Sequence, residues 1–469
     1  MTASQKFLNW ASMALVCVGV AAACLAADSL PPASLVPAGV AKVDITPEMP
    51  VRMYGYAARK TESEGVAGRL KASALALASD AEPGPAVLLT VDCGAVPDTL
   101  RQEVFRRVTS RFPLRPERFV LCNSHNHSGP DLKGMPAMTG TEREHLEQYA
   151  RFLADRLESV VVEALQTRQP AQLAWTIGSV PFAANRRVLK DGKWTGFGAV
   201  LDAPADHSLP LLRVSDAQGK LRAVVFNYAC HNTTLRGNFK QIHGDWAGCA
   251  QEYIEADHPG AVALVTIGCG ADADPYPHGT VELCQRHGRQ IADEVKRLLS
   301  GPLRPVRFPL LARSATLEIP FAPLPTKEEL QALAKRSYPA QRMLRLIEQG
   351  EKPPASRSYC ITVWAFDDDL AMIFLSDEVV VDYALRMKRQ FDGSRLWITA
   401  YAHGVSNYIV SKRLLGEGGY EVNNSLSSLV TFGRPEQLQP AMEDRIVQQV
   451  VKLLPTQFLA PRGPERNPQ

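Results

Sequence analysis

The sequence predicts an α/β fold with mixed, largely parallel sheets and flanking helices, and three observations support this prediction. Apolar, β-branched runs of strand length recur along the 469 residues. Amphipathic helical segments separate several of these runs, which is typical of α/β domains. Polar and titratable residues follow the strands, where the active sites of α/β sheets are usually assembled.

Five segments have the composition of buried strands. They are 86–91 (AVLLTV), 118–122 (RFVLC), 221–229 (LRAVVFNYA), 261–267 (AVALVTI) and 370–375 (LAMIFL).

Four segments have the apolar spacing of amphipathic helices. They are 141–165, 281–299, 325–336 and roughly 440–454. The third begins with a capping box, because Thr326 is followed three residues later by Glu329. No internal repeat or linker interrupts residues 35–460, so we expect a single catalytic domain there.

The N-terminal residues 1–26 have the layout of a secretory signal peptide. One lysine precedes an uncharged apolar run that ends in small residues, so cleavage is expected after Ala26. The alternatives are a lipoprotein signal with Cys24 as the acylated residue and an uncleaved membrane anchor. We therefore expect an exported protein, periplasmic or secreted.

Overall charge excludes some classes of partner. Lys and Arg total 52 against 49 Asp and Glu, a net +3, and no long charged run is present. The sequence thus predicts no nucleic-acid partner. Seven cysteines lie outside the signal, without the dense spacing of a disulfide framework. A bridge between Cys249 and Cys284 remains open.

Titratable clusters follow four of the predicted strands. NSHNHSGP follows 118–122, His231 follows 221–229, GADADPYPHG comes soon after 261–267, and Glu378 follows 370–375.

Two imidazoles and a carboxylate delivered from separate strand ends suit zinc, which prefers about four ligands in a tetrahedron. We therefore expect His125, His231 and Glu378 to hold Zn²⁺, which would activate a water molecule. His127 would lie beside the ion as a hydrogen-bonding or proton-transfer group. Asp272 and Asp274 could bind a metal too, or serve only as turn residues in a glycine-rich loop.

At these places the chain resembles the catalytic domain of the neutral and alkaline non-lysosomal ceramidases. The similarity starts with KVDITPEMPVRMYGYAARK and continues in the family's order over most of residues 40–450. Its further segments are LLTVDCGAVP, NSHNHSGPDL, FNYACHNTTL, HGDWAGCA, GCGADADPYP, SDEVVVDYALRMK and SNYIVSKRLLGEGGYE.

The resemblance implies a complete zinc site. His125, His231 and Glu378 match the family's zinc ligands, and Tyr408 matches an unusual tyrosine ligand. The implied catalytic and substrate-contacting residues are His127, Tyr420 and Arg186, although Arg187 fits the arginine position almost as well.

Three departures from the family concern the substrate more than the zinc. The loop that carries a serine near "GDISP" in the family reads GADADP here. Asp272 or Asp274 takes the place of this serine, and we assign Asp274 to the catalytic group. The segment before Glu378 reads LSD instead of a Pro-Gly pair. The family's C-terminal immunoglobulin-like domain has no counterpart after the last predicted helix.

The leading hypothesis is an exported zinc-dependent hydrolase of an N-acyl amide, ceramide or a related lipid amide. A lipid substrate would bring the protein into peripheral contact with membranes. One alternative is a zinc hydrolase for a different ester, sugar or phosphoester. The other is a noncatalytic binding protein on the same scaffold. The sequence leaves the oligomeric state open.

Overall fold

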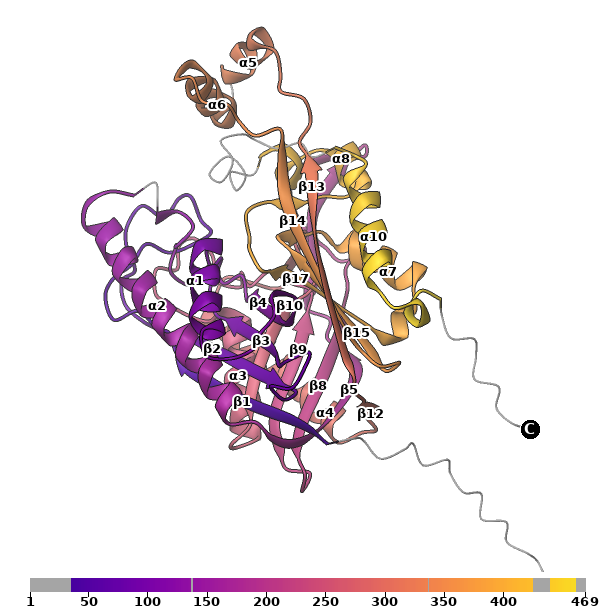
Figure 1. Ribbon diagram of the computed structural model, residues 1–469. Helices are drawn as coiled ribbons and strands as arrows, with labels where there is room; N and C mark the ends of the chain where they lie inside the picture. The colour runs from indigo at the N-terminus through magenta and orange to yellow at the C-terminus, as the bar shows by residue number, and fades with distance from the viewer. Residues whose placement is uncertain (1–34, 136–137, 336, 425–438, 461–469) are drawn as a thin grey trace, which may run out of the picture. The chain divides into compact units, whose positions relative to one another are not determined.

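Thirteen strands form one mixed sheet in the computed structural model, which describes residues 35–135, 138–335, 337–424 and 439–460 (Figure 1). The expected signal peptide and the C-terminal tail lie outside these residues. Along the chain the strands are β1 (Val36–Asp44), β2 (Lys71–Leu77), β3 (Ala86–Val91), β4 (Phe119–Asn123), β5 (Gln169–Ser179), β8 (Ser208–Asp216), β9 (Leu221–Tyr228), β10 (Val262–Ile267), β12 (Arg304–Val306), β13 (Leu310–Pro320), β14 (Ser356–Phe366), β15 (Leu370–Ser376) and β17 (Leu396–Ala402).

Their order in the sheet is β10-β9-β8-β5-β1-β2-β3-β4-β17-β15-β14-β13, with β12 paired to β5. All five predicted strands are present, and the mixed α/β class is confirmed.

Fewer strands pair in parallel than the sequence predicted, and each parallel pair is connected by a helix. Only β3 with β4, β9 with β10, and β15 with β17 are parallel within this sheet. A helix connects the two strands of each pair: α1 (Asp98–Thr109), α3 (Asp245–Asp257) and α7 (Val381–Gln390). Parallel strands need such a crossover, whereas neighbours joined by turns run antiparallel. The strands predicted to carry the site belong to these three pairs.

The sheet curls so that its two halves share an apolar interior. Strand β10, at one end of the order, contacts β2, β4 and β17 from the other half. Large side chains from both halves, including Trp175, Leu212, Trp364 and Trp397, form one buried cluster. The carboxyl ends of β4, β9, β10 and β15 are therefore brought toward one another.

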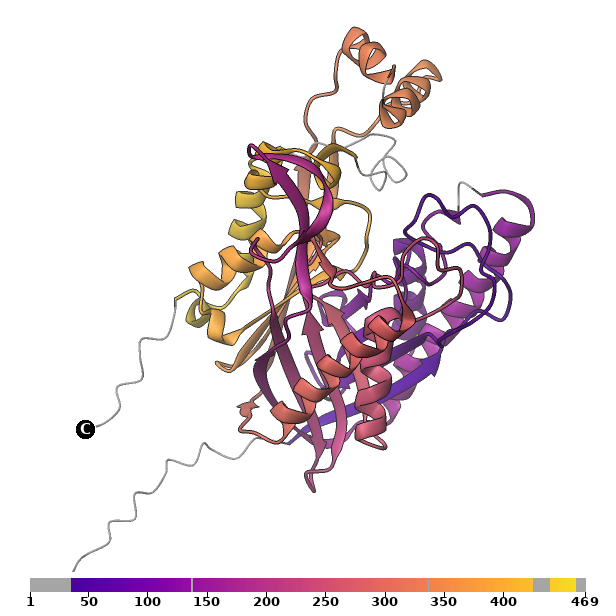
Figure 2. The same cartoon turned by 180° about the vertical axis from the view of Figure 1, so that it is seen from behind.

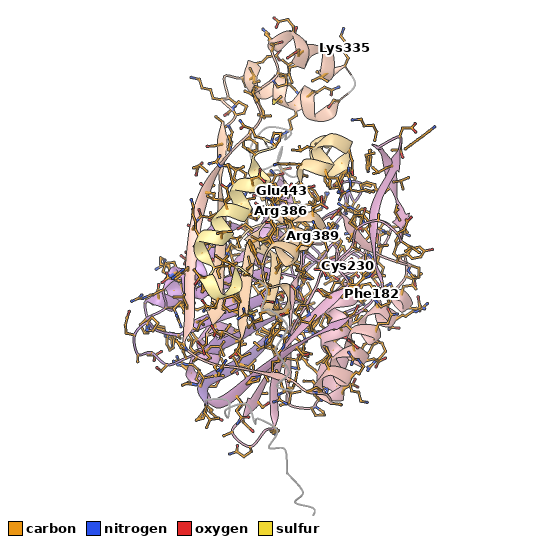
Figure 3. The ribbon with its side chains drawn as sticks, turned by 90° about the vertical axis from the view of Figure 1, so that its right-hand side faces the viewer. Phe182, Cys230, Lys335, Arg386, Arg389 and Glu443 are labelled. Carbon is orange, nitrogen blue, oxygen red and sulfur yellow. The ribbon has the colours of Figure 1, made fainter. Side chains whose placement is uncertain are left out.

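Helices cover the outer faces of the curled sheet. Helices α1 and α2 (Gly140–Gln166) pack over β1 to β4, and the predicted apolar face of α2, including Leu146 and Leu153, is buried there. Figure 2 shows α3 lying against α4 (Val281–Leu299). On another part of the sheet, α7 contacts α10 (Met442–Leu453), and an ion pair of 2.8 Å joins Arg386 to Glu443 (Figure 3).

Smaller elements complete the described chain. Between β13 and β14 lie α5 (Lys327–Ala334), whose predicted capping box is present, and α6 (Tyr338–Glu348). Short pairings are formed by β6 (Ala183–Lys190), β7 (Lys193–Val200) and β11 (Ala273–Pro275), and by β16 (Glu378–Val379) with β18 (Tyr408–Ile409); helix α8 spans Lys412–Glu417. Within the described ranges, no helix combines the length and apolar character needed to cross a membrane.

Candidate metal centre and substrate cavity

The predicted ligands converge because their strands end at one place. His125 follows β4 by two residues, and His231 follows β9 by three. Glu378 opens β16, which pairs in parallel with β18 so that Glu378 lies opposite Tyr408. All four side chains are buried, with exposed fractions between 0% and 4%. The structure thus brings residues 125, 231, 378 and 408 together from distant parts of the sequence.

Backbone carbonyls fix the orientation of two histidines. The Nδ1 atom of His125 lies 3.0 Å from the Gly94 carbonyl oxygen, and Nδ1 of His231 lies 2.9 Å from that of Gly270. A carbonyl oxygen accepts only, so both rings carry their hydrogen on Nδ1. Their Nε2 atoms are therefore left as acceptors, which is the arrangement of metal-binding histidines.

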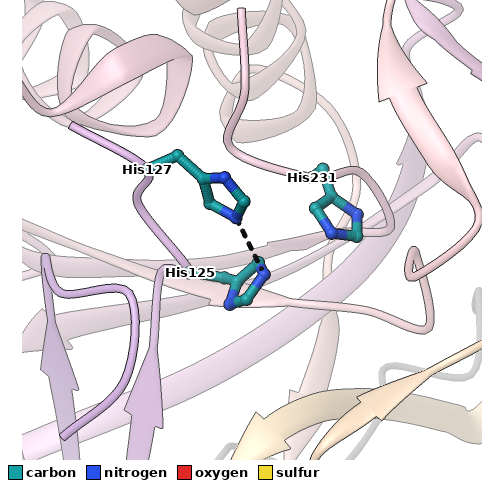
Figure 4. A group of neighbouring side chains, drawn as sticks. All are labelled: His125, His127 and His231. Atoms are coloured by element: carbon teal, nitrogen blue, oxygen red, sulfur yellow. Dashed lines mark hydrogen bonds between the residues drawn. The ribbon is translucent and has the colours of Figure 1, made fainter. Parts of the chain in front are cut away.

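His127 lies within contact distance of His125, closer than a residue that only supports the ligands needs to be. Its Nε2 atom lies 3.1 Å from Nε2 of His125 (Figure 4). Within the described chain, His125, His127 and His231 form a group whose ligand atoms all lie within 4.8 Å of one another, a geometry that could hold a metal ion. His127 is therefore placed either to ligate an ion or to exchange a proton beside it.

The carboxylate of Glu378 completes a cluster of acceptors. Its Oε2 atom lies 3.1 Å from Nε2 of His125 and 3.3 Å from Nε2 of His231. Neither Glu378 Oε2 nor His231 Nε2 has a hydrogen-bond partner among the described residues, although both are buried. Buried acceptors that face one another without a donor are costly. A bound cation removes that cost, so these residues fit a metal ion.

The protonation states also suit zinc. Burial, together with His125 and His231, holds the pKa of His127 well below its ordinary value. Burial and Arg186 lower the pKa of His231 in the same way. Burial raises the pKa of Glu378, but the neighbouring His125 and His231 outweigh it and hold that pKa well below its ordinary value. Neutral imidazoles and an ionised carboxylate are zinc ligands.

Arg186 connects the cluster to a cavity. Its Nη2 donates to the hydroxyl of Tyr408 at 3.2 Å, its Nε to Glu421 at 2.9 Å and its Nη1 to Asp274 at 3.3 Å. The ring of Tyr420 packs edge-on against that of Tyr408, with centroids 5.7 Å apart. Arg186, Tyr408 and Tyr420 therefore lie on one side of the same site.

Arg187 has a different role from its neighbour. It donates to Glu417, Glu421 and the carbonyl oxygen of Gly418, which fastens β6 to the segment after α8. Arg186 lines the cavity, whereas Arg187 is absent from the described residues that do so. Of these two arginines, Arg186 is therefore the one that a molecule in the cavity would meet.

A cavity of about 540 Å³ opens beside the histidine group. We call His127, Arg186, Tyr408 and Tyr420 its inner wall, and Arg236, Asp274, Tyr276 and His278 its outer wall.

The two aspartates of the GADADP loop lie in different surroundings and have different roles. Asp274 lines the cavity, whereas the Asp272 carboxylate accepts the backbone N–H of Val381 at 2.8 Å, at the first turn of α7. Burial raises the pKa of Asp272 to about 6. Burial also raises the pKa of Asp274, but Arg186 and Arg236 outweigh it and hold that pKa below its ordinary value. Asp272 thus anchors a helix, and Asp274 is ionised in the cavity.

Sequence reasoning missed Tyr54 and Tyr401. The ring of Tyr401 lies 4.5 Å from that of His125, and its buried hydroxyl has no hydrogen-bond partner among the described residues. Tyr54 packs edge-on against both His125 and His127. Tyr401 lies within β17 and Tyr54 in the MYGYA segment, and neither position carries a sequence pattern that indicates contact with the histidines.

The sequence of this chain also matches a known protein family over part of its length. Residues 37–267 match the family model "Neutral/alkaline non-lysosomal ceramidase, N-terminal". This part of the chain is similar to that family. Neutral ceramidase A of Dictyostelium discoideum is 24% identical over 243 residues, which are 49% of this chain and 33% of that protein. The aligned region thus spans about a third of that relative's length.

Two solved structures share the fold over most of the chain. Neutral ceramidase from Pseudomonas aeruginosa superposes with a TM-score of 0.69 at 18% identity, covering 92% of this chain and 77% of that one. A ceramidase complexed with C2 gives a TM-score of 0.67 at 17% identity over the same shares. At these identities the likeness establishes the mixed α/β fold of the family.

Proposed function

We propose that the chain is an exported zinc-dependent hydrolase that cleaves an N-acyl amide. One observation carries the proposal: acceptor atoms of the buried residues His125, His231 and Glu378 converge with His127 beside a cavity, and neither His231 Nε2 nor Glu378 Oε2 has a hydrogen-bond partner among the described residues. The family of residues 37–267 supports an amide as the scissile bond.

In this proposal His125, His231, Glu378 and Tyr408 hold the ion. Zinc, when bound, supplies a Lewis acid and lowers the pKa of bound water to about 7. The phenol of Tyr408 has a pKa raised well above its ordinary value by burial and by Glu378. Ligation by Tyr408 therefore depends on the cation, with Arg186 as a hydrogen-bond donor to the same oxygen.

The other residues of the inner wall transfer protons or bind the acyl oxygen of the substrate. Neutral His127 can accept a proton from the nucleophilic water and return it to the departing amine, as a general base and then a general acid. Arg186 and Tyr420 present donors to the oxygen of the acyl group as negative charge develops on it. Burial of Arg186 strengthens this interaction, because few waters compete for the guanidinium.

A substrate panel tests the proposal. Zinc-loaded protein should hydrolyse N-acyl amides, ceramide among them, whereas metal-free protein should not. Phosphoesters and acylated sugars serve as the competing classes. Turnover of either class with inert amides would replace amide hydrolysis by the alternative activity. Ligand binding without turnover of any class would indicate a noncatalytic protein.

Export requires a separate experiment. Expression of the full chain in a Gram-negative host, followed by mass spectrometry of the mature N-terminus, should find cleavage after Ala26. A lipid-modified Cys24 would support the lipoprotein alternative, and an intact Met1 in the cytoplasmic fraction would contradict export.

A further inference from the structure

The outer wall of the cavity takes no part in the proposed chemistry, yet it is a built site. Arg236 comes from the loop after β9, and Asp274 lies in β11. Both Nη atoms of Arg236 donate to Oδ2 of Asp274 at 3.0 Å, and its Nε lies 3.1 Å from Nδ1 of His278. Two segments that follow neighbouring parallel strands are thus joined at the cavity by an ion pair in which one carboxylate oxygen accepts two N–H groups.

The acceptor capacity of Asp274 is already used. Besides the two bonds from Arg236, its Oδ1 accepts from Nη1 of Arg186 at 3.3 Å and from Oγ1 of Thr233 at 3.4 Å. A carboxylate offers about four acceptor sites. Asp274 therefore has little capacity left for a cation or a hydroxyl group of a substrate.

The arginines, in contrast, have donors to spare. A guanidinium carries five N–H groups. Arg186 uses three of them in its bonds to Glu421, Asp274 and Tyr408. Arg236 uses three toward Asp274 and His278 and contacts the hydroxyl of Tyr56 as well. Unused N–H groups of both side chains are available to a further acceptor.

The formal charge of the cavity lining also favours an anionic ligand. Its described lining contains two guanidiniums, Arg186 and Arg236, and one carboxylate, Asp274, so 2 − 1 leaves one positive charge on the lining with the histidines neutral. The carboxylate of Glu421, which pairs with Arg186 at 2.9 Å, is fully buried outside this lining. The side chain of Arg236 is 29% exposed and that of Arg186 is 8% exposed. An anion entering from solvent would meet Arg236 first and Arg186 deeper in the cavity.

We propose that the substrate carries an anionic group, a carboxylate or a phosphate, which Arg236 of the outer wall binds together with Arg186 of the inner wall, while the amide lies beside the histidine group. The exposed rings of Phe197 and Tyr276 at the cavity border suit the apolar part of the same molecule. This inference rests on the proposed function and narrows its substrate to an N-acyl amide with a charged head. Ceramide, which is neutral, is then a poorer substrate.

Three substrates with one acyl chain test the inference: N-dodecanoylglycine, N-dodecanoylphosphoethanolamine and neutral N-dodecanoylethanolamine. Zinc-loaded protein should cleave the carboxylate or the phosphate compound with kcat/KM at least about tenfold above the neutral one. Arg236→Gln should remove this preference, with a loss of kcat/KM for the anionic compound about tenfold larger than the loss for the neutral one. Equal rates for all three, or an equal loss for all three in the variant, would overturn the inference.

Two control variants separate charge from folding. Arg236→Lys keeps the charge and should keep most of the preference for an anion. Arg289→Gln removes an arginine that pairs with Asp257 on the surface of α3 and α4, and it should leave the preference unchanged.

Binding separates the inference from the proposed function. If no amide is cleaved, the proposed function fails, but calorimetric titration with the same three compounds still reports on the outer wall. At least about tenfold tighter binding of an anionic compound, lost in Arg236→Gln, supports the inference. Binding that is the same for the three compounds, or the same in the variant, contradicts it.

Discussion

The inner and outer walls of the cavity are built in different ways. The buried candidate ligands at residues 125, 231, 378 and 408 follow or open strands, in segments that resemble the ceramidase family. The outer wall centres on the ion pair between Arg236, in the loop after β9, and Asp274, in β11, and Asp274 lies in the segment where the sequence departs from that family. In the proposed scheme Arg236 selects the substrate, the buried ligands hold the metal ion, and Arg186 serves both walls. The difference teaches that Arg236 can be changed without touching the metal centre.

His231→Ala should have the largest effect, because it removes an acceptor from the buried cluster. We expect kcat/KM for amides to fall by at least about a thousandfold, with loss of bound zinc. Steady-state kinetics and metal content measure both. His258→Ala, at the C-terminal end of α3, is the matched control. Zinc-dependent activity that survives in His231→Ala would break the assignment of the metal centre.

His127→Gln should lower kcat by about a hundredfold to ten-thousandfold, the usual contribution of a general acid or base. Metal content decides between its two roles. Retained zinc with a low kcat supports proton transfer, and loss of zinc makes His127 a ligand. An unchanged kcat would exclude both roles.

Asp274→Asn sharpens the comparison between the walls. It removes the carboxylate that opposes Arg186 and Arg236, so an anionic substrate should bind a few-fold more tightly, about 1 kcal/mol. KM for N-dodecanoylglycine is the measurement, with Asp257→Asn on the surface as the control. A fall in kcat of more than about tenfold for neutral and anionic amides alike would instead make Asp274 a catalytic residue.

Asp272→Asn should affect stability more than activity. Burial raises the pKa of Asp272 to about 6 from 3.8. The folded state therefore holds the proton more tightly, and this stabilisation is present below about pH 4 and lost as pH rises through about 6. The loss amounts to at most about 3 kcal/mol.

Chemical denaturation of parent and variant across this range gives the free energy of unfolding. The difference between the two proteins should change with pH between about 4 and 6. A difference that is independent of pH would show that Asp272 is not a buried, titrating group.

Much of the fold could be predicted because its signals are local. Apolar runs identified the central strands, and helical periodicity identified α2 and α4. The pairing of those strands could not be predicted, since it depends on which connections contain a crossover helix and on how the sheet curls. The expectation of largely parallel pairing therefore applies only to the three pairs that α1, α3 and α7 connect.

The candidate site divides in the same way. The ligand positions were recognisable from ordered motifs, and the structure brings His125, His231, Glu378 and Tyr408 together. Arg186 and Arg187 are neighbours in sequence, and only the register of β6 turns the first toward the cavity. Gly55 had no signal of its own, yet a Cβ atom there would lie 2.2 Å from Nδ1 of His127, and its φ is +95°. Such close approaches exist only in three dimensions.

Zinc content is the most direct test of the central claim that residues 125, 231 and 378 form a metal centre. Parent protein and Glu378→Ala should be purified in parallel without chelators, and their metal measured by mass spectrometry. We predict about one zinc per parent chain and a loss of most of it in Glu378→Ala. No zinc in the parent, or undiminished zinc in the variant, would contradict the account.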